Sequence, residues 1–118
     1  MNLISGEIIS NESGPAFHSI SVNIELPEKY SSAEPGPATL GIRPGQIGIK
    51  PAGDLQKKIL LVEPLGKDTL LYFESEEERG LIAIVDSNSK YSAGDTVFLD
   101  LLPQHIFLFD GNGQRVLN

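Results

Sequence analysis

The stretch KKILLVEPLGKDTLLYFE, residues Lys57–Glu74, has the pattern of two strands joined by a tight turn. Lys57–Leu65 is a long apolar segment that ends next to a proline, and Thr69–Glu74 runs back from it. The turn Gly66-Lys67-Asp68 supplies the glycine that short hairpin loops use. The stretch therefore predicts a β-hairpin, and the rest of the chain repeats its short apolar segments.

Almost every other apolar cluster is also short and bounded by turn residues, which is typical of a compact all-β domain. Pro27–Pro37 is a loop rich in proline, serine and glycine, and Asn112-Gly113 is expected to supply the positive φ angles of a last hairpin. No segment predicts an amphipathic helix. The predicted strands are Asn2–Ser10, Ser21–Leu26, Ala38–Arg43, Ile47–Lys50, Lys57–Leu65, Thr69–Glu74, Gly80–Val85, Thr96–Leu102, Ile106–Phe109 and Gln114–Leu117.

Short antiparallel strands without helices predict an all-β fold made of a small OB-like barrel. With 118 residues the chain is the size of one domain. The strands before and after Lys57 could belong to one barrel or to two interleaved sub-barrels, roughly 1–55 and 56–118. The sequence leaves this choice open.

Charge and composition exclude several classes of function. The chain has 16 acidic against 9 basic residues and a net charge of −7, which argues against a nucleic-acid or anionic-membrane partner. No window approaches the roughly 18 consecutive apolar residues of a membrane span, and the start lacks the basic region of a secretory signal. The absence of cysteine excludes disulfides and thiolate metal sites and fits a reducing cytoplasm.

Gly66-Lys67-Asp68-Thr69 is the segment most similar to a nucleotide-binding motif, but it does not match the P-loop pattern. Leu61 stands where the first glycine of that motif belongs, and Asp68 replaces the hydroxyl residue that binds Mg²⁺. A carboxylate at that position would repel phosphate. A hairpin turn is the better interpretation.

The remaining candidates for chemistry are weak. Asp110–Gly113 lacks the further ligands of a calcium loop, and His18 and His105 do not have metal-ligand spacing. No nucleophile elbow or local Ser/His/Asp group is present. We therefore predict no catalytic residue, no cofactor and no metal in this chain. The acidic residues Glu74 and Glu76–Glu78, beside Arg79, predict a solvated turn or, alternatively, a docking surface for a basic partner.

Four stretches follow one another in the order seen in one family: MNLISGEI (Met1–Ile8), LGIRPGQI (Leu40–Ile47), VEPLGKDTLLYFE (Val62–Glu74) and GDTVFLDLLPQHIFLFDGNGQRV (Gly94–Val116). Together they resemble the C-terminal regulatory domain, with its TOBE segment, of ABC-importer ATPase subunits of the maltose, multiple-sugar and glycerol-phosphate type. The resemblance covers essentially the whole chain.

This resemblance implies a TOBE/MOP-like β-barrel module that follows an ATPase domain and holds two copies of the subunit together. Walker A, LSGGQ and Walker B sequences are absent, so ATP and Mg²⁺ are expected to bind in an ATPase domain outside this chain. The family implies contact with membrane subunits through that domain, an inhibitory regulatory protein in some members, and a cytoplasmic location at the inner face of the membrane. Met1-Asn2 match an internal family position, so we expect the chain to be a fragment.

Six residues stand at matching motif positions and are our candidates for interface or family-motif roles: Gly41, Arg43, Pro44, Glu63, Gly66 and Asp68. Pro44 disfavours helical geometry at Arg43 and predicts an extended corner there. Arg43 could then bind loop carbonyls, the carboxylates of Glu63 or Asp68, or a partner subunit. Gly45 replaces a glutamate that is common in the family, and Asp68 stands where glutamate is usual.

Two other functions remain open. Related TOBE-type domains of molybdate systems bind oxyanions, and here Ser31-Ser32 with Lys67-Asp68-Thr69 could contribute, although the net charge opposes this. An OB barrel could also bind single-stranded nucleic acid, but Phe73, Phe98, Phe107 and Phe109 are more typical of core positions than of stacking platforms. The transported solute is not indicated by the sequence.

Overall fold

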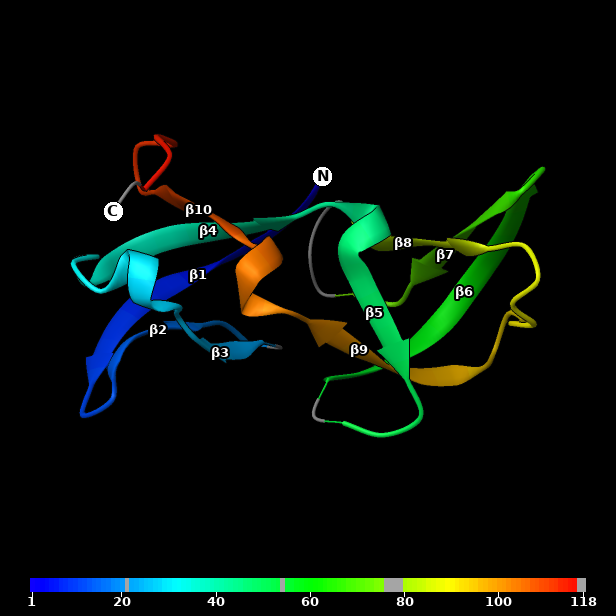
Figure 1. Ribbon diagram of the computed structural model, residues 1–118, viewed down its shortest axis with the longest axis horizontal. Helices are drawn as coiled ribbons and strands as arrows, with labels where there is room; N and C mark the ends of the chain where they lie inside the picture. Colours follow the sequence, from blue (N-terminus) through cyan, green and yellow to red (C-terminus); the bar gives the residue numbers. More distant parts are fainter. Residues whose placement is uncertain (21, 54, 76–79, 117–118) are drawn as a thin grey trace.

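The computed structural model describes residues 1–20, 22–53, 55–75 and 80–116, and it confirms the all-β class (Figure 1). Its helical elements in those ranges are three short 3-10 turns, and no helix there is long and apolar enough to cross a membrane. The elements are β1 (Asn2–Asn11), β2 (Gly14–His18), β3 (Asn23–Glu25), η1 (Glu28–Tyr30), β4 (Gly36–Ile42), η2 (Pro44–Gln46), β5 (Ile47–Lys50), β6 (Leu55–Leu65), β7 (Asp68–Phe73), β8 (Leu81–Asp86), β9 (Thr96–Leu101), η3 (Pro103–His105) and β10 (Phe107–Asp110).

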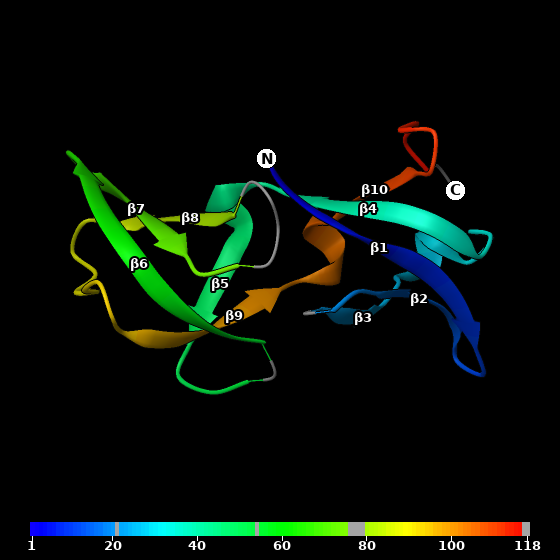
Figure 2. The ribbon, with the colours of Figure 1, turned by 180° about the vertical axis from the view of Figure 1, so that it is seen from behind.

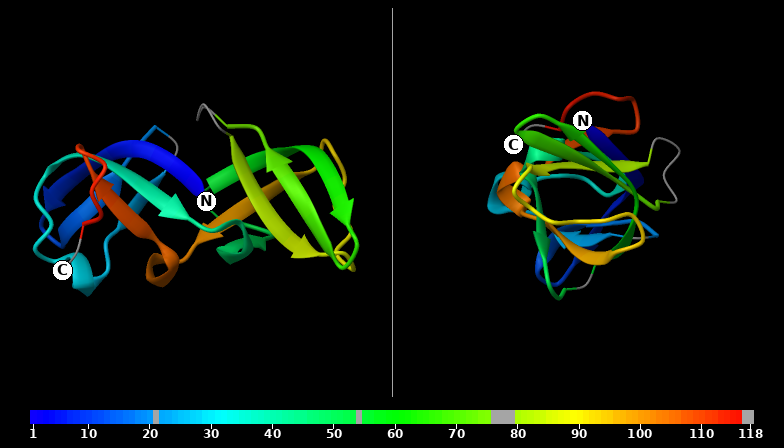
Figure 3. Two further views of the ribbon diagram at one scale, coloured as in Figure 1. Left: turned by 90° about the horizontal axis from the view of Figure 1, so that it is seen from above. Right: turned by 90° about the vertical axis from the view of Figure 1, so that its right-hand side faces the viewer.

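The strands form two five-stranded antiparallel sheets, which lie side by side along the long axis of the molecule (Figures 1 and 3). The first sheet has the order β10-β4-β1-β2-β3, and the second has the order β5-β9-β6-β7-β8. The chain crosses between them twice, at η2 and at η3. The sheets are thus interleaved in sequence, but their division does not fall near residue 55, because β5 belongs to the second sheet and β10 to the first.

Both crossings have the same local structure, in which an extended residue is followed by a proline that begins a 3-10 turn. Arg43 precedes Pro44 with φ −73° and ψ 142°, and Leu102 precedes Pro103 with φ −66° and ψ 127°. A proline makes its preceding residue extended and can itself start a helical turn. The corner predicted at Arg43-Pro44 is therefore present, and it occurs a second time.

One hydrophobic cluster runs through both sheets, so the molecule has a continuous core. Alternation along β7 shows how it is built: Thr69, Leu71 and Phe73 are buried, whereas Leu70 and Tyr72 are on the outer face. The largest fully buried side chains are Phe17, Ile4, Leu40, Ile42, Ile59, Leu71, Ile106 and Leu108.

Asn2 joins the two sheets through its buried side chain. Its Nδ2 donates to the carbonyl oxygen of Ile82 at 2.8 Å, and its Oδ1 accepts from the amide of Ile82 at 2.8 Å. The start of β1 is thereby fixed to β8, the edge strand of the second sheet. In Figure 2 the N-terminus lies at this junction between the sheets.

The structure differs from the sequence-based expectations in several elements. β2 was not predicted, because Gly14-Pro15 has the composition of a turn. Asn112 does not have a positive φ; within its turn only Gly113 does, at 80°. The expected strand Gln114–Leu117 is reduced, in its described part, to a single bridge between Arg115 and Phe109. The expectations for Glu76–Arg79 lie outside the described residues.

Candidate functional site

The outer face of β6, β7 and β8 carries a cluster of apolar side chains. Cross-strand register aligns Leu61 with Tyr72 and Ile82 in one row, and Leu70 with Ile84 in the next. Neighbouring side chains on one sheet face lie close enough to act as one surface. We call this surface the outer face, and its apolar members are Leu61, Leu65, Leu70, Tyr72, Ile82 and Ile84.

This surface is open to solvent. The exposed fractions are 52% for Leu61, 58% for Leu65 and 36% for Ile84, and Leu60 beside them is 57% exposed at an irregularity in β6. Apolar side chains that gather in this way mark an interaction site more often than scattered ones do. The strands that carry this surface belong to the second sheet, which fills one half of the molecule (Figure 3, left).

The free edge of β6 is poorly suited to pairing with another strand. β9 pairs with Leu55–Lys58, and among the described residues no strand pairs with the second half of β6 on that side. The two-residue loop after Leu65 makes Leu65 and Asp68 a paired position, which turns the backbone of Val62 and Pro64 toward the free edge. Proline has no amide to donate there. The exposed feature of this hairpin is therefore its face.

A polar pair lies within the apolar surface. The hydroxyl of Tyr72 donates to Oε1 of Glu63 at 3.0 Å. This hydrogen bond raises the pKa of Tyr72 above the ordinary value of 10.0, and desolvation and the negative charge of Glu63 act in the same direction. Glu63, one of the predicted motif residues, thus fixes the phenol of Tyr72 on the outer face.

The Tyr72 phenol should ionise at a higher pH in the native chain than in a Glu63→Gln variant. The folded state holds the phenolic proton more tightly than the unfolded chain, so this stabilisation is present below pH 10.0 and is lost as the pH rises through the folded-state pKa. Tyrosinate absorbance measures the shift, and Tyr72→Phe assigns the signal. An identical titration curve in Glu63→Gln would contradict the role given to this carboxylate.

Gly66 and Asp68 form the turn that was predicted. Gly66 has φ 87°, and positive φ at the first of two loop residues is the pattern of a type II′ hairpin turn. Its carbonyl accepts from the hydroxyl of Ser87 at 2.6 Å, and Ser87 is also bonded to Thr69 at 3.1 Å. These contacts fix the hairpin tip against the end of β8. Asp68 pairs in register with Asp86, so the tip is acidic.

The other predicted motif residues lie elsewhere, and the six do not form one site. Gly41 is buried in the first sheet, where an added Cβ would lie 2.6 Å from Sδ of Met1 and 3.2 Å from Cε2 of Phe109. Arg43 and Pro44 form the crossing to η2. The guanidinium of Arg43 lies over the ring of Phe107, 5.3 Å from its centroid, instead of meeting Glu63 or Asp68.

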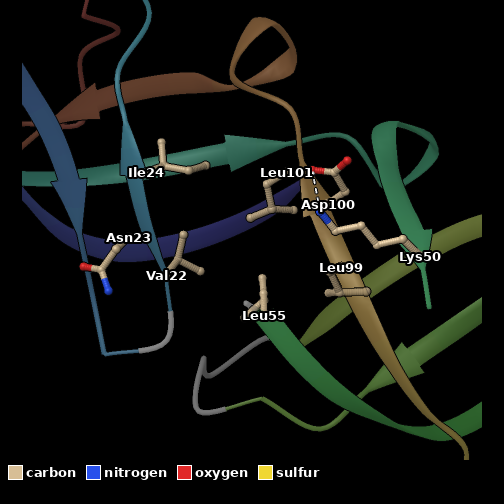
Figure 4. Close-up of a pocket in the computed structure, with 8 residues that line it drawn as sticks. All are labelled: Val22, Asn23, Ile24, Lys50, Leu55, Leu99, Asp100 and Leu101. Atoms are coloured by element: carbon tan, nitrogen blue, oxygen red, sulfur yellow. Dashed lines mark ion pairs between the residues drawn. The ribbon is translucent and has the colours of Figure 1, made fainter. Parts of the chain in front are cut away.

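A cleft of about 360 Å³ separates β3 from the second sheet (Figure 4). Lys50 and Asp100 at its rim form an ion pair of 3.8 Å, so their charges largely cancel. Both side chains are well exposed, and such pairs contribute little stability. The apolar residues of the cleft are Val22, Ile24, Leu55, Leu99 and Leu101. This cleft does not gather groups that could do acid–base chemistry or bind an oxyanion.

The residues expected for an oxyanion sensor do not meet. Ser31-Ser32 follow η1 beside the first sheet, whereas Lys67 is at the tip of the β6–β7 hairpin at the opposite end (Figure 1). His18 contacts the side chain of Asn23 through Nδ1, and His105 is half-buried in η3. Within the described part of the chain, no three His, Cys, Asp or Glu residues gather as metal ligands.

Comparison with known proteins finds a family model and several relatives that match this chain. A family model described as TOBE domain matches residues 40–109. The sn-glycerol-3-phosphate import ATP-binding protein UgpC of Escherichia coli K12 is 33% identical over 121 residues, which cover 98% of this chain and 33% of that protein. UgpC of Shigella boydii is 32% identical with the same coverage, and UgpC of Psychromonas ingrahamii is 32% identical over 75% of this chain and 26% of its own length. The chain spans a third or less of these relatives, and it belongs to the TOBE domain family.

Proposed function

We propose that this chain is the regulatory and dimerisation module of the ATP-binding subunit of an ABC importer for sugars, polyols or glycerol-phosphate-like solutes. The similarity to UgpC supports the assignment, because those proteins are named as ATP-binding proteins of sn-glycerol-3-phosphate import. The observation that carries the dimerisation role is the exposed apolar outer face of β6–β7–β8.

In this proposal, ATP and Mg²⁺ bind to an ATPase domain outside this chain, and that domain contacts the membrane subunits. The module itself acts by binding. Its place is the cytoplasmic side of the membrane, within the transporter complex. An inhibitory regulatory protein is a further partner that would bind the assembled subunits.

The occupant that we assign to the outer face is a second copy of the chain. A two-fold contact lets one surface serve both copies, so each apolar row is covered by the same rows of its partner. The acidic tip with Asp68 and Asp86 restricts the geometry, because two such tips repel. If the two-fold axis runs across the strands, the two hairpin tips lie at opposite ends of the contact. Each tip is then near Lys58, in the first half of β6 of the other copy. Added salt should then weaken the dimer.

Replacing Leu61 by lysine should weaken self-association of the chain by about tenfold or more, because it places a charge within the apolar surface that the two copies would bury. The side chain is 52% exposed, so folding should be unaffected. Ile20→Lys is the matched control, since Ile20 is 87% exposed and belongs to the first half of the molecule. Sedimentation equilibrium over a concentration series measures both variants. Equal association of both variants and the wild type would contradict the assignment.

Deleting this module from the longer ATP-binding subunit tests its role in the assembly. We expect the subunit to lose stable dimerisation in the absence of nucleotide, as measured by light scattering. A deleted subunit that still dimerises like the intact one would exclude the tethering role.

A further inference from the structure

Two arginines that are far apart in sequence lie close to the same aromatic ring. The guanidinium carbon of Arg115 lies 4.7 Å from the ring centroid of Phe107, and that of Arg43 lies 5.3 Å from it. Arg43 directly follows β4, and Arg115 faces Phe109 across a single bridge. β4 and β10 are neighbours in the first sheet, which is why the two side chains converge.

Neither guanidinium is neutralised by the described part of the chain. The ion pair found there is between Lys50 and Asp100. Asp110, the acidic side chain nearest to Arg115 in sequence, accepts from the amides of Asn112 at 2.9 Å and Gln114 at 3.0 Å, so it closes its own turn. Both arginine side chains are exposed.

The chemistry of this cluster favours an oxyanion. A guanidinium presents five N–H donors in a planar fork that matches two oxygen atoms, and stacking on a ring uses its face and leaves its N–H edge available. Because Phe107 already restricts both side chains, little further ordering is needed when a ligand binds. A tetrahedral dianion can accept from both forks at once.

We propose that Arg43, Arg115 and Phe107 form a binding site for a phosphate dianion, either inorganic phosphate or the phosphate of a small monoester. The site differs from two other cationic side chains of the chain, those of Lys50 and Lys29. Lys50 is paired with Asp100, and Lys29 lies alone over Tyr30 at 5.2 Å from the ring centroid. It also differs from the serine and lysine residues that the sequence suggested for an oxyanion.

The position of the site gives phosphate a structural effect. Arg43 is the residue before the first crossing between the sheets, and Phe107 begins the strand after the second crossing. A bound anion would connect these two points to the segment after β10. It would thereby restrict movement between the sheets. This inference is independent of self-association, since the site lies in the first sheet and not on the outer face.

An NMR titration of the ¹⁵N-labelled chain with inorganic phosphate at constant ionic strength tests the proposal. We expect saturable shifts at Arg43, Phe107 and Arg115, and no such shifts when chloride replaces phosphate. Arg43→Gln and Arg115→Gln should each weaken binding by about tenfold, because each removes one charged fork. Lys29→Gln is the matched control and should bind like the wild type.

The titration also distinguishes the two sources of phosphate. Ethyl phosphate that binds as well as inorganic phosphate would indicate a monoester ligand, and much weaker binding would indicate the free ion. Shifts that never saturate, or affinities that are the same in both arginine variants as in the wild type, would overturn the proposal. Unchanged spectra elsewhere in each variant establish that the fold is intact.

Discussion

Replacing Gly6 by alanine is expected to lower the free energy of unfolding by about 3 kcal/mol, which is a large effect for one methyl group. Gly6 lies in β1 where the chain leaving β2 passes directly over it. An added Cβ would lie 2.7 Å from Cζ of Phe17 and 3.0 Å from Cβ of Ser19, and it would also meet the carbonyl oxygen of His18. Phe17 is fully buried, and the contact with His18 is made by its backbone carbonyl. Moving either group away would therefore cost free energy.

Chemical denaturation of the purified variant measures this effect. The matched control is Gly45→Ala, because Gly45 has no atom within 4 Å of an added Cβ and its φ is not positive. That substitution should leave stability unchanged or raise it by about 0.4–1 kcal/mol, because alanine lowers the conformational entropy of the unfolded chain. If Gly6→Ala unfolded at the same denaturant concentration as the wild type, this result would contradict the close approach between Gly6 in β1 and the end of β2.

Asn2→Ala is expected to destabilise the chain by about 3 kcal/mol, because it leaves two partly buried backbone groups of Ile82 without their side-chain partner. The amide of Asn2 satisfies both the N–H and the carbonyl of Ile82, and Asn2 is only 5% exposed. Loss of this clamp releases the start of β1 from β8. We therefore expect faster hydrogen exchange at Ile82 in addition to the lower stability.

The control for this substitution is Asn112→Ala. Asn112 is an exposed asparagine in the last turn, and its replacement should change stability by less than about 0.5 kcal/mol. Thermal unfolding and hydrogen exchange of both variants provide the comparison. Equal stabilities for the two variants would show that the link between the sheets contributes nothing.

Local chemistry made parts of this fold predictable. The β6–β7 hairpin follows from a glycine in a two-residue loop, and the Arg43-Pro44 corner follows from the restriction that proline imposes on its neighbour. The strands with clear boundaries, such as Ile47–Lys50 and Thr96–Leu101, were predicted within a residue of their ends. In each case the cause lies within a few residues of its effect.

The features that escaped prediction depend on contacts that are distant in sequence. β2 contains Gly14 and Pro15, which have turn propensity, yet pairing with β1 on one side and β3 on the other makes it a strand. β5 joins the second sheet and β10 joins the first, and both assignments depend on pairing between strands that are far apart in sequence. The convergence of Arg43 and Arg115 on Phe107 likewise requires β4 and β10 to be neighbours. A periodic pattern carries none of this information.

The outer face could be predicted only in part from the sequence. Alternation along Asp68–Phe73 separates an inner from an outer set of side chains, and this could be derived from the sequence. The cross-strand rows that bring Leu61, Tyr72 and Ile82 together depend on the register of three strands, including an irregularity beside Leu61. The family resemblance implied that two copies of the subunit are held together, and the structure supplies candidate residues for such a contact.

A dilution series of the ¹⁵N-labelled wild-type chain tests the assignment of this surface most directly, because it maps self-association without altering a side chain. Amide shifts that change with concentration should cluster at Leu61, Leu65, Leu70, Tyr72, Ile82 and Ile84, and they should follow a single monomer–dimer equilibrium. Spectra that do not change with concentration, or changes confined to the first sheet, would contradict the account.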